Sequence, residues 1–498
     1  MQRILFVFPN TANTPVIPNA IACLAGIAKS FFYDVEYFDT FMYKKSNDSG
    51  TDRELSAEFK PCNIDRILEN KPFEDLVPDL QNKIVTAKPD IIAISCMSFE
   101  YEFLVSFFPK IIVPKNVFVV IGGIHSILKP EDVVNTGLFD LVCIGEGDIT
   151  FSDILIRIKN KGDLSSIENT YYRNRIDGTI IKNNRRKLQH ETELWNVIPD
   201  YSIFNNQYFL YPFDGTLYRR FNIEFSRGCP YSCTYCGNAA LQQAYKGLGK
   251  FVRKRPIGSI KEHILRMIRE HDIELFYFQD ECFFLHSAEW LSEVAEWYGK
   301  YIKIPYIIQT RPETITQDKI DILKSMNAPF FQVSCGIESG SEKILQRVAN
   351  RKTEINTIIN VFDILKKNEI RTCAFFMIGF PYETKEDIWK SIELCRIIRP
   401  SVAIVSIFQP MIGQKLREVC IEEGYMTGYE KLTTFTSGSI LNMPQISSDE
   451  LSNLRRVFML YAYLPEKYYS DIERCEKDFL SHKKLYNELV EKRWALSE

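Results

Sequence analysis

The sequence lacks the features that would place the protein in a membrane or on nucleic acid. No apolar run approaches the roughly 20 residues of a membrane span. The opening MQRILFVFPN lacks a signal-peptide layout, because its apolar stretch is short and ends in a turn. Neither charge is in surplus: 61 Lys and Arg face 64 Asp and Glu, whereas a nucleic-acid-binding surface needs a basic excess. We therefore expect a cytoplasmic globular protein with no membrane span and no nucleic-acid partner.

The sequence also lacks internal repeats, low-complexity tracts and clustered cysteines, with one exception to the last. Thirteen cysteines are spread over 498 residues, and most, such as Cys96 and Cys335, lie in apolar stretches. In a large intracellular chain such residues are expected to be reduced, buried thiols. The exception is the stretch SRGCPYSCTYCGN, which holds Cys229, Cys233 and Cys236.

Alternating strand and helix patterns predict an α/β domain over residues 1–160. The apolar runs RILFVF, DVEYF, DIIAIS, NVFVVIGG and DLVCIGEG are typical of buried parallel strands. Amphipathic stretches between them predict helical crossovers, for example over 19–30 and 100–110. Five short strands joined in this way predict a doubly wound, flavodoxin-like (Rossmann-type) sheet.

The rest of the chain predicts a second, incomplete barrel. Residues 161–216 are predicted to be a linker with a β-hairpin that turns at Asp177-Gly178. Six strand patterns follow over 217–420, fewer than the eight of a closed barrel, and predict a partial (β/α)6 TIM-like barrel. Residues 421–498 are predicted to be C-terminal helices, chiefly over 448–463 and 467–492.

The three clustered cysteines follow the first barrel strand, at the mouth where such folds carry their chemistry. Thiolates are soft ligands suited to zinc or iron–sulfur clusters. A structural zinc site needs four ligands, and no fourth Cys or His lies at finger-like spacing. The spacing of Cys229, Cys233 and Cys236 therefore favours a cubane cluster with one open iron. A zinc knuckle with a distant fourth ligand, or simply buried cysteines, are the alternatives.

The stretch CPYSCTYC resembles the cluster motif of the radical S-adenosylmethionine (SAM) superfamily. The resemblance implies a 4Fe–4S cluster held by the three cysteines. It also implies that the open iron chelates S-adenosylmethionine, whose reductive cleavage yields a 5′-deoxyadenosyl radical with electrons from a donor such as flavodoxin or ferredoxin. In the family the aromatic residue before the last cysteine borders the adenine, a role that the resemblance gives to Tyr235.

Other predicted strand ends supply further residues that match the family. Asp280 and Glu281, in YFQDE, match the groups that receive the methionine ammonium, although they could instead cap the next helix. Arg311 is a possible carboxylate partner. Glu338 and Ser339 are expected at the mouth.

The last two barrel strands add one further match and one departure. Gly379 is expected to let the backbone approach the ligand. Gln414 stands where relatives usually have a threonine, so no role is assigned to it.

In the first domain, short polar and glycine-rich stretches follow three predicted strands. They contain Ser95, then Gly122-Gly123, then Gly145-Glu146-Gly147. Because the carboxyl ends of strands line the ligand crevice of a doubly wound sheet, these stretches are either a cradle for a large ligand or ordinary turns.

These stretches resemble the cobalamin-binding domain that precedes many radical SAM domains, which makes cobalamin the expected ligand. The family's Asp-x-His-x-x-Gly motif is absent: FPNTANTPVIPN stands in its place, so that loop offers no histidine to cobalt. His125 lies after the glycine pair and is no substitute.

The two resemblances predict a cobalamin-dependent radical methyltransferase that acts on an unactivated carbon of a small molecule, lipid or peptide. One S-adenosylmethionine would methylate cobalamin and another would supply the radical. The alternatives are a non-methylating radical enzyme, a non-enzymatic sensor, and a methylthiotransferase with a second cluster on Cys23, Cys62 and Cys96. A methylthiotransferase is disfavoured because no β-rich C-terminal module follows the barrel.

Overall fold

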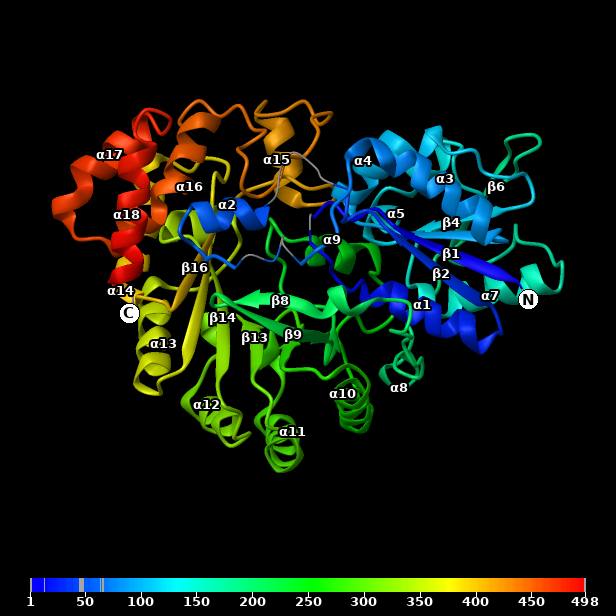
Figure 1. Cartoon of the computed structure of the whole chain (residues 1–498), viewed down its shortest axis with the longest axis horizontal. Helices are drawn as coiled ribbons and strands as arrows, with labels where there is room; N and C mark the ends of the chain where they lie inside the picture. Colours follow the sequence, from blue (N-terminus) through cyan, green and yellow to red (C-terminus); the bar gives the residue numbers. More distant parts are fainter. Residues whose placement is uncertain (1, 13, 44–48, 63, 65–66, 497–498) are drawn as a thin grey trace. The chain divides into compact units, whose positions relative to one another are not determined.

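Two seven-stranded sheets organise the computed structural model, which describes residues 2–12, 14–43, 49–62, 64 and 67–496 (Figure 1). The described residues divide into two units. The first unit comprises residues 1–46, 63–210 and 240–259, and the second comprises 47–62, 211–239 and 260–498. No helix in the described ranges is long and apolar enough to cross a membrane.

The sheet of the first unit has the order β2-β1-β3-β4-β5-β6-β7. Strands β1 to β5 are parallel, and β6 and β7 extend the sheet as an antiparallel hairpin. The chain order reverses between β1 and β3, the point at which doubly wound sheets bind ligands. The strand bounds are β1 (Arg3–Phe8), β2 (Asp34–Asp39), β3 (Ile91–Ser95), β4 (Phe118–Gly122), β5 (Leu141–Cys143), β6 (Thr170–Arg173) and β7 (Ile180–Lys182).

Helices cover both faces of this sheet (Figure 1). The α3 and α4 side holds a cluster of fully buried Leu, Ile, Val and Phe side chains that includes Leu80, Leu104 and Ile121. Helices α1 and α7 pack together on the other face. The helix bounds are α1 (Asn19–Ser30), α3 (Leu76–Ala87), α4 (Ser98–Phe107), α5 (Ile124–Leu128), α6 (Pro130–Asn135), α7 (Gly147–Lys159) and α8 (Glu191–Leu194); the two-residue strand β11 is Arg253–Lys254.

The sheet of the second unit has the order β16-β15-β14-β13-β12-β9-β8 and does not close into a full barrel. The six strands from β9 to β16 along this order are parallel. The strand bounds are β8 (Leu210–Phe213), β9 (Thr216–Ile223), β12 (Leu275–Phe278), β13 (Tyr306–Thr310), β14 (Phe331–Glu338), β15 (Arg371–Ile378) and β16 (Val402–Ile407); the two-residue strand β10 is Ser226–Arg227.

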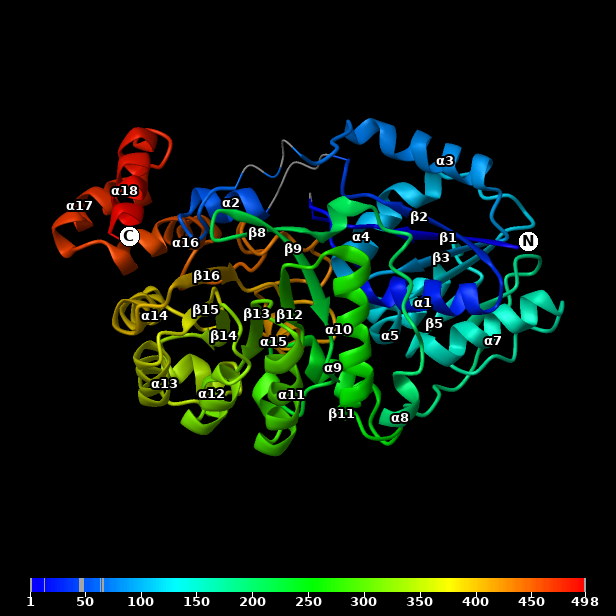
Figure 2. The same ribbon diagram turned by 60° about the horizontal axis from the view of Figure 1, so that its bottom comes forward.

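Helices α11 to α14 lie along one side of this sheet (Figure 2). Helix α16 packs on the edge strand β16 and is followed by two shorter helices. The bounds are α9 (Gly237–Ala244), α10 (Ile257–His271), α11 (Ala288–Tyr301), α12 (Gln317–Lys324), α13 (Ile355–Lys367), α14 (Lys385–Ile398), α15 (Lys415–Glu422), α16 (Ser448–Tyr463), α17 (Tyr469–Lys477) and α18 (Lys483–Ala495). Helices α9 and α10 run from one unit into the other.

A segment from the first 65 residues belongs to the second unit and covers the edge strand β16. Helix α2 (Ser49–Leu55) and the residues after it place Glu58 against Arg455, with 2.6 Å between carboxylate and guanidinium. Glu58 accepts a hydrogen bond from the Val405 N–H, and Arg53 and Arg455 donate to the Val405 carbonyl. These side chains satisfy backbone groups that an edge strand would otherwise leave unpaired.

The predicted fold class is confirmed: a doubly wound sheet is followed by a parallel, incomplete barrel and C-terminal helices. The division into units differs from the predicted boundaries. Residues 170–182, expected in a linker, extend the first sheet, and β8 joins the second sheet through the turn Asp214-Gly215, where both residues have positive φ. The helix expected over 467–492 is interrupted at 478–482 and forms α17 and α18.

Candidate active site

The three clustered cysteines lie in a loop between β9 and α9, at the carboxyl end of the first parallel strand of the barrel. We call residues 228–236 the cysteine loop. Cys229 and Cys233 are buried, Cys236 is half-buried, and all three are free thiols. Helix α9 begins directly after Cys236.

The middle of the cysteine loop is held by residues that follow β14. Asn350 donates its side-chain amide to the Ser232 carbonyl (2.9 Å), and Thr234 donates its hydroxyl to the carbonyl of Val348 (2.5 Å). Val348 is the last residue of a five-residue π-helix, Ile344–Val348, and Asn350 lies two residues beyond it. Single-turn π segments of this kind are frequent at functional sites.

The residue before the last cysteine is held from two further directions. The Tyr235 hydroxyl accepts a hydrogen bond from Arg351 (3.1 Å), and Arg351 also pairs with Glu338 (3.0 Å). Gln414, which follows β16, donates its amide to the Tyr235 carbonyl (2.5 Å) and accepts the Met411 N–H (2.9 Å). Gln414, to which no role was assigned from the sequence, therefore holds the backbone of the cysteine loop in place.

Glu338 has a backbone conformation that non-glycine residues rarely adopt. Its φ of +69° lies in the left-handed region, and the register between β14 and β15 shifts at this point. Arg351, which is 2% exposed, fixes the Glu338 carboxylate and also donates to the Gly336 carbonyl (2.7 Å). Strained conformations of this kind cluster at ligand sites, so the placement keeps Glu338 as a candidate.

Asp280, predicted to receive a cofactor ammonium, already has four donors. Its carboxylate accepts the Phe225 and Ser226 N–H groups, the Ser226 hydroxyl and the His286 Nε2, at 2.7–2.9 Å. It is 2% exposed. The prediction of an ammonium contact stays a prediction, but the observed contacts tie the end of β12 to the strand end before the cysteine loop. His286 also stacks on Trp290, with 3.8 Å between ring centroids.

Glu281 is placed differently from its neighbour. Its side chain is exposed. The Glu281 carboxylate forms a hydrogen bond with the Asn238 side chain and interacts electrostatically with Cys236. Gly237 lies next to this position, and a Cβ built there would meet no atom within 4 Å. Glu281 and Gly237 therefore border open space beside the last cysteine.

Two other predicted mouth residues are packed inside the second unit. Ser339 is fully buried and accepts the Ser341 N–H. Gly379 has a φ of +83°, and a Cβ there would lie 3.1 Å from Leu451. The backbone conformation and the packing against α16 explain why residue 379 is a glycine. Direct contact with a ligand remains a prediction for both positions.

The donor set of the cysteine loop fits an iron–sulfur cubane. Burial raises the pKa of Cys229 to about 12 and also raises the pKa of Cys236, so these thiols are neutral at pH 7 until a cation displaces their protons. Within the described ranges, no three Cys, His, Asp or Glu side chains gather around a single-ion site. The loop supplies three free thiols, and a cubane takes three thiolates, each on a different iron.

In the first unit, the predicted stretches do meet at one edge of the sheet. Ser95 at the end of β3 is in register with Gly122 at the end of β4. Gly123 has a φ of +102°, and a Cβ there would lie 2.4 Å from the Cys96 carbonyl oxygen. Gly123 is therefore required by contact between two loops of the protein itself, whereas a Cβ at Gly122 would meet only Cys143, at 3.4 Å.

The Gly-Glu-Gly stretch is also engaged by the protein. A Cβ at Gly145 would meet the Asn169 side chain at 2.1 Å, and one at Gly147 would meet Leu24 at 3.3 Å. Glu146 forms a two-pronged pair with the buried Arg253, at 2.5 and 2.8 Å. These contacts lie within the first unit, and they explain why each residue of the stretch is needed for packing or pairing inside the protein.

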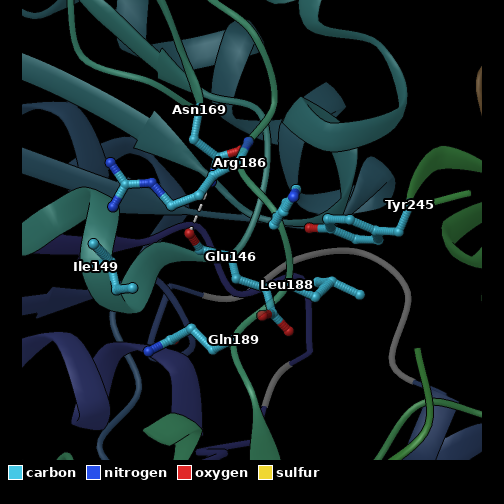
Figure 3. Close-up of a pocket in the computed structure, with 8 residues that line it drawn as sticks. Glu146, Ile149, Asn169, Arg186, Leu188, Gln189 and Tyr245 are labelled. Atoms are coloured by element: carbon cyan, nitrogen blue, oxygen red, sulfur yellow. Dashed lines mark hydrogen bonds between the residues drawn. The ribbon is translucent and has the colours of Figure 1, made fainter. Parts of the chain in front are cut away.

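A small pocket opens beside this stretch (Figure 3). Most of its lining residues are polar, but Asn169 already donates to the Glu146 carbonyl (3.0 Å), and Arg186 pairs with Asp153 (2.7 Å). The lining residues are Glu146, Ile149, Asn169, Arg186, Lys187, Leu188, Gln189 and Tyr245. The pocket belongs to the packing at the end of β5.

Two polar atoms at the carboxyl end of β4 lack partners. His125 is 3% exposed and Ser126 is fully buried; the His125 Nε2 and the Ser126 hydroxyl have no hydrogen-bond partner among the described residues. His125 Nδ1 lies 3.2 Å from the Ser98 hydroxyl, and the ring stacks on Tyr101. Buried polar atoms normally have partners, so a ligand at this sheet edge would complete them.

Comparison with known proteins agrees with this geometry. Residues 223–395 match the model of the radical SAM superfamily. The chain is 23% identical over 505 residues to the anaerobic magnesium-protoporphyrin IX monomethyl ester cyclase of Rubrivivax gelatinosus, covering 96% of this chain and 82% of that protein. It is 22% identical to the cytidylyl-2-hydroxyethylphosphonate methyltransferase of Streptomyces wedmorensis, covering 89% and 85%.

A solved structure shares the fold along the whole chain. The cobalamin-dependent S-adenosylmethionine radical enzyme OxsB, solved with aqua-cobalamin bound, has a TM-score of 0.64 at 14% identity and covers 100% of this chain and 72% of its own. The superfamily match implies a 4Fe–4S cluster and S-adenosylmethionine as cofactors. The chain therefore carries a radical SAM domain over residues 223–395, on a fold that it shares with OxsB, and is a radical SAM enzyme.

Proposed function

We propose that this radical SAM enzyme is a cobalamin-dependent methyltransferase that methylates an unactivated carbon of a small molecule, lipid or peptide. The observation that carries the proposal is the pairing of two features on one chain. A cysteine loop fixed from three barrel strands follows a doubly wound sheet whose carboxyl edge holds unpartnered buried polar atoms. Relatives named as methyltransferases support it.

We propose that Cys229, Cys233 and Cys236 hold the 4Fe–4S cluster. When loaded and reduced by a flavodoxin- or ferredoxin-type donor, such a cluster supplies the electron that cleaves S-adenosylmethionine. The exposed Glu281 is the group we assign to the cofactor ammonium, because it borders open space whereas Asp280 is fully engaged. The half-buried Tyr235 ring is held in place by Arg351 and Gln414 and would border the adenine.

We propose the carboxyl edge of the first sheet as the cobalamin site. Ser95 is half-buried at the end of β3, and its hydroxyl has no hydrogen-bond partner within the described part of the chain, so the hydroxyl is available to a ligand. The His125 Nε2 and Ser126 hydroxyl offer further polar contacts, of the kind that corrin amides and phosphate groups take. The loop after β1 contains no histidine, so cobalt would take no protein histidine there.

A non-methylating radical enzyme, such as a ring-forming one, is the second candidate. It is favoured by the likeness to the Rubrivivax gelatinosus cyclase, which extends over nearly the whole chain. The cysteine loop and the first sheet serve both candidates, so their geometry does not separate them. The fate of the methyl group of S-adenosylmethionine does.

The test uses anaerobically reconstituted full-length protein, hydroxocobalamin, a strong reductant and S-adenosylmethionine labelled in its methyl group. A methyltransferase should move label into the protein-bound cobalamin fraction and release S-adenosylhomocysteine. Formation of 5′-deoxyadenosine with no S-adenosylhomocysteine and no labelled cobalamin would replace the first candidate with the second. Protein carrying alanine at all three loop cysteines is the matched control for 5′-deoxyadenosine formation.

A further inference from the structure

Arg311 lies against the cysteine loop with its guanidinium fixed on three sides. It follows β13 and is 9% exposed. Its Nη1 donates to the Cys233 Sγ at 3.4 Å, and its guanidinium carbon lies 3.7 Å from the centre of the Tyr231 ring. Its Nε donates to the Glu313 carboxylate at 2.5 Å. Two of its partners, Tyr231 and Cys233, belong to the loop that carries the predicted cluster ligands.

The contacts of Arg311 fix the direction of its N–H groups. Glu313 also accepts the Thr353 hydroxyl (2.9 Å), so the carboxylate that orients the guanidinium is itself anchored. The ring of Tyr231 gives the cation a flat, partly desolvated surface. The N–H that points at Cys233 is therefore held in place before any ligand arrives.

A donor aimed at a ligand sulfur has a predictable effect on redox chemistry. An iron–sulfur cluster gains negative charge when it is reduced, and hydrogen bonds to its sulfurs stabilise the added charge and raise the reduction potential. Because Arg311 is paired with Glu313, their charges largely cancel, and the N–H directed at the sulfur is the remaining contribution. No equivalent side-chain donor to Cys229 or Cys236 is found within the described part of the chain apart from Asn238, which neighbours Cys236.

We infer that Arg311 is a positioning and tuning residue: its N–H to the Cys233 sulfur raises the reduction potential of the cluster that the cysteine loop holds. This rests on the proposed function, in which Cys233 ligates the cluster. The partner assigned to Arg311 is thus the cysteine sulfur, whereas the earlier expectation for this residue was a cofactor carboxylate. Its Nη2 has no partner among the described residues and can still meet that carboxylate.

The test is an EPR-monitored redox titration of reconstituted full-length protein without S-adenosylmethionine. Arg311→Met removes the donor but leaves Glu313 unpaired, so its midpoint should become more negative for two reasons. The double variant Arg311→Met with Glu313→Gln restores the neutral balance without restoring the N–H. We expect its midpoint to stay below that of the wild-type protein. Arg269→Met, at an exposed arginine on α10, is the matched control and should leave the midpoint unchanged.

A double variant that titrates at the wild-type midpoint would overturn the inference, because net charge alone would then explain the single variant. Should either Arg311 variant fail to take up iron, Tyr231→Leu decides. It leaves Arg311 and Cys233 in place but removes the ring that fixes the guanidinium, so a more negative midpoint supports the inference and a wild-type midpoint overturns it. Wild-type protein that takes up no cluster would instead refute the proposed function.

Discussion

The cysteine loop of the second unit and the strand-end loops of the first unit occupy equivalent places, each at the carboxyl edge of a parallel sheet. They use their residues in opposite ways. The cysteine loop is held at Ser232 and Tyr235 by the side chains of Asn350 and Gln414, and at Thr234 by the Val348 carbonyl, whereas Gly237, just after the loop, borders open space. In the first unit the glycines at the strand ends pack against protein, as Gly123 does against Cys96.

This difference shows which residue types in a sequence indicate that a ligand binds nearby. Smaller apolar side chains could fill any packing role of three thiols in one loop. The clustering of the thiols therefore indicates ligand chemistry. A glycine serves a turn, a close approach of two loops or a ligand equally well. In the first unit a ligand is indicated instead by the His125 Nε2 and the Ser126 hydroxyl, two buried polar atoms that lack partners in the described structure.

The strongest test of this contrast removes the thiols. Replacing Cys229, Cys233 and Cys236 together with alanine should abolish iron binding, which in the reconstituted wild-type protein should be about four irons and four sulfides per chain. Iron and sulfide assays on anaerobically reconstituted protein measure this. Cys62→Ala is the control, because Cys62 lies outside the loop, and its iron content should equal that of the wild type. A triple variant that keeps its cluster would break the assignment.

A second test separates two adjacent carboxylates. Asp280→Ala leaves the buried Phe225 N–H and His286 donors without an acceptor and should cost about 3–5 kcal/mol of stability. Glu281→Gln, at an exposed position, should change stability by no more than about 0.5 kcal/mol yet weaken S-adenosylmethionine binding to the reconstituted protein. Denaturant unfolding and calorimetric titration measure the two effects. The same stability loss in both variants would show that the contrast is wrong.

A third test asks what the glycine pair is for. Gly123→Ala forces a side chain into a left-handed conformation and against the Cys96 carbonyl, and should destabilise the protein by about 3 kcal/mol even without cobalamin. Gly122→Ala is the matched neighbour: its Cβ would lie 3.4 Å from Cys143, an ordinary contact. We expect a change of about 0.5 kcal/mol or less there. Equal and small losses of stability at both positions would mean that the fold needs neither glycine and that the pair serves ligand binding alone.

Much of the fold could be predicted from the sequence because it is carried by local patterns. Buried parallel strands read as continuous apolar runs, and helices show their period and caps; α1 and α16 have the predicted bounds. The segment of α2 and Glu58 that covers the edge strand β16 could not be predicted. Its pairing of Glu58 with Arg455 joins residues that are far apart in the chain, and no local pattern records such a contact.

The site shows the same limit. The cysteines could be singled out because three lie within eight positions, directly after the first strand of a predicted barrel; that they ligate a cluster stays a prediction. Arg351, Gln414 and His286 were not predicted, since each acts through a contact with a distant segment. Asp280 and Glu281 look alike in sequence, and only the direction of each side chain after β12 separates a buried anchor from an exposed candidate ligand.

The most delicate test concerns His125, the residue that best represents the first unit's side of the contrast. Burial lowers its pKa to about 4, and the charge of Lys129 adds to the shift. Around the ring lie Ser98 and Tyr101.

Because the folded-state pKa lies below the value of about 6.5 for an unfolded histidine, the unfolded chain takes up a proton between about pH 6.5 and 4 that the folded chain refuses. Stability should therefore fall as the pH falls through this window. Between pH 7.5 and pH 5.5, His125 should lower the free energy of unfolding by about 1.4 kcal/mol. His125→Gln should abolish this pH-dependent loss.

The measurement is the stability difference between wild-type protein and His125→Gln, from denaturant unfolding at pH 7.5 and 5.5. The gap should narrow at pH 5.5, because only the wild-type protein loses this contribution. A gap that is the same at both pH values would mean that the His125 ring is not held in a buried, neutral form. Repeating the series with hydroxocobalamin sharpens the comparison: if the ligand supplies the missing partner of Nε2, the wild-type protein should gain more stability from it than the variant does.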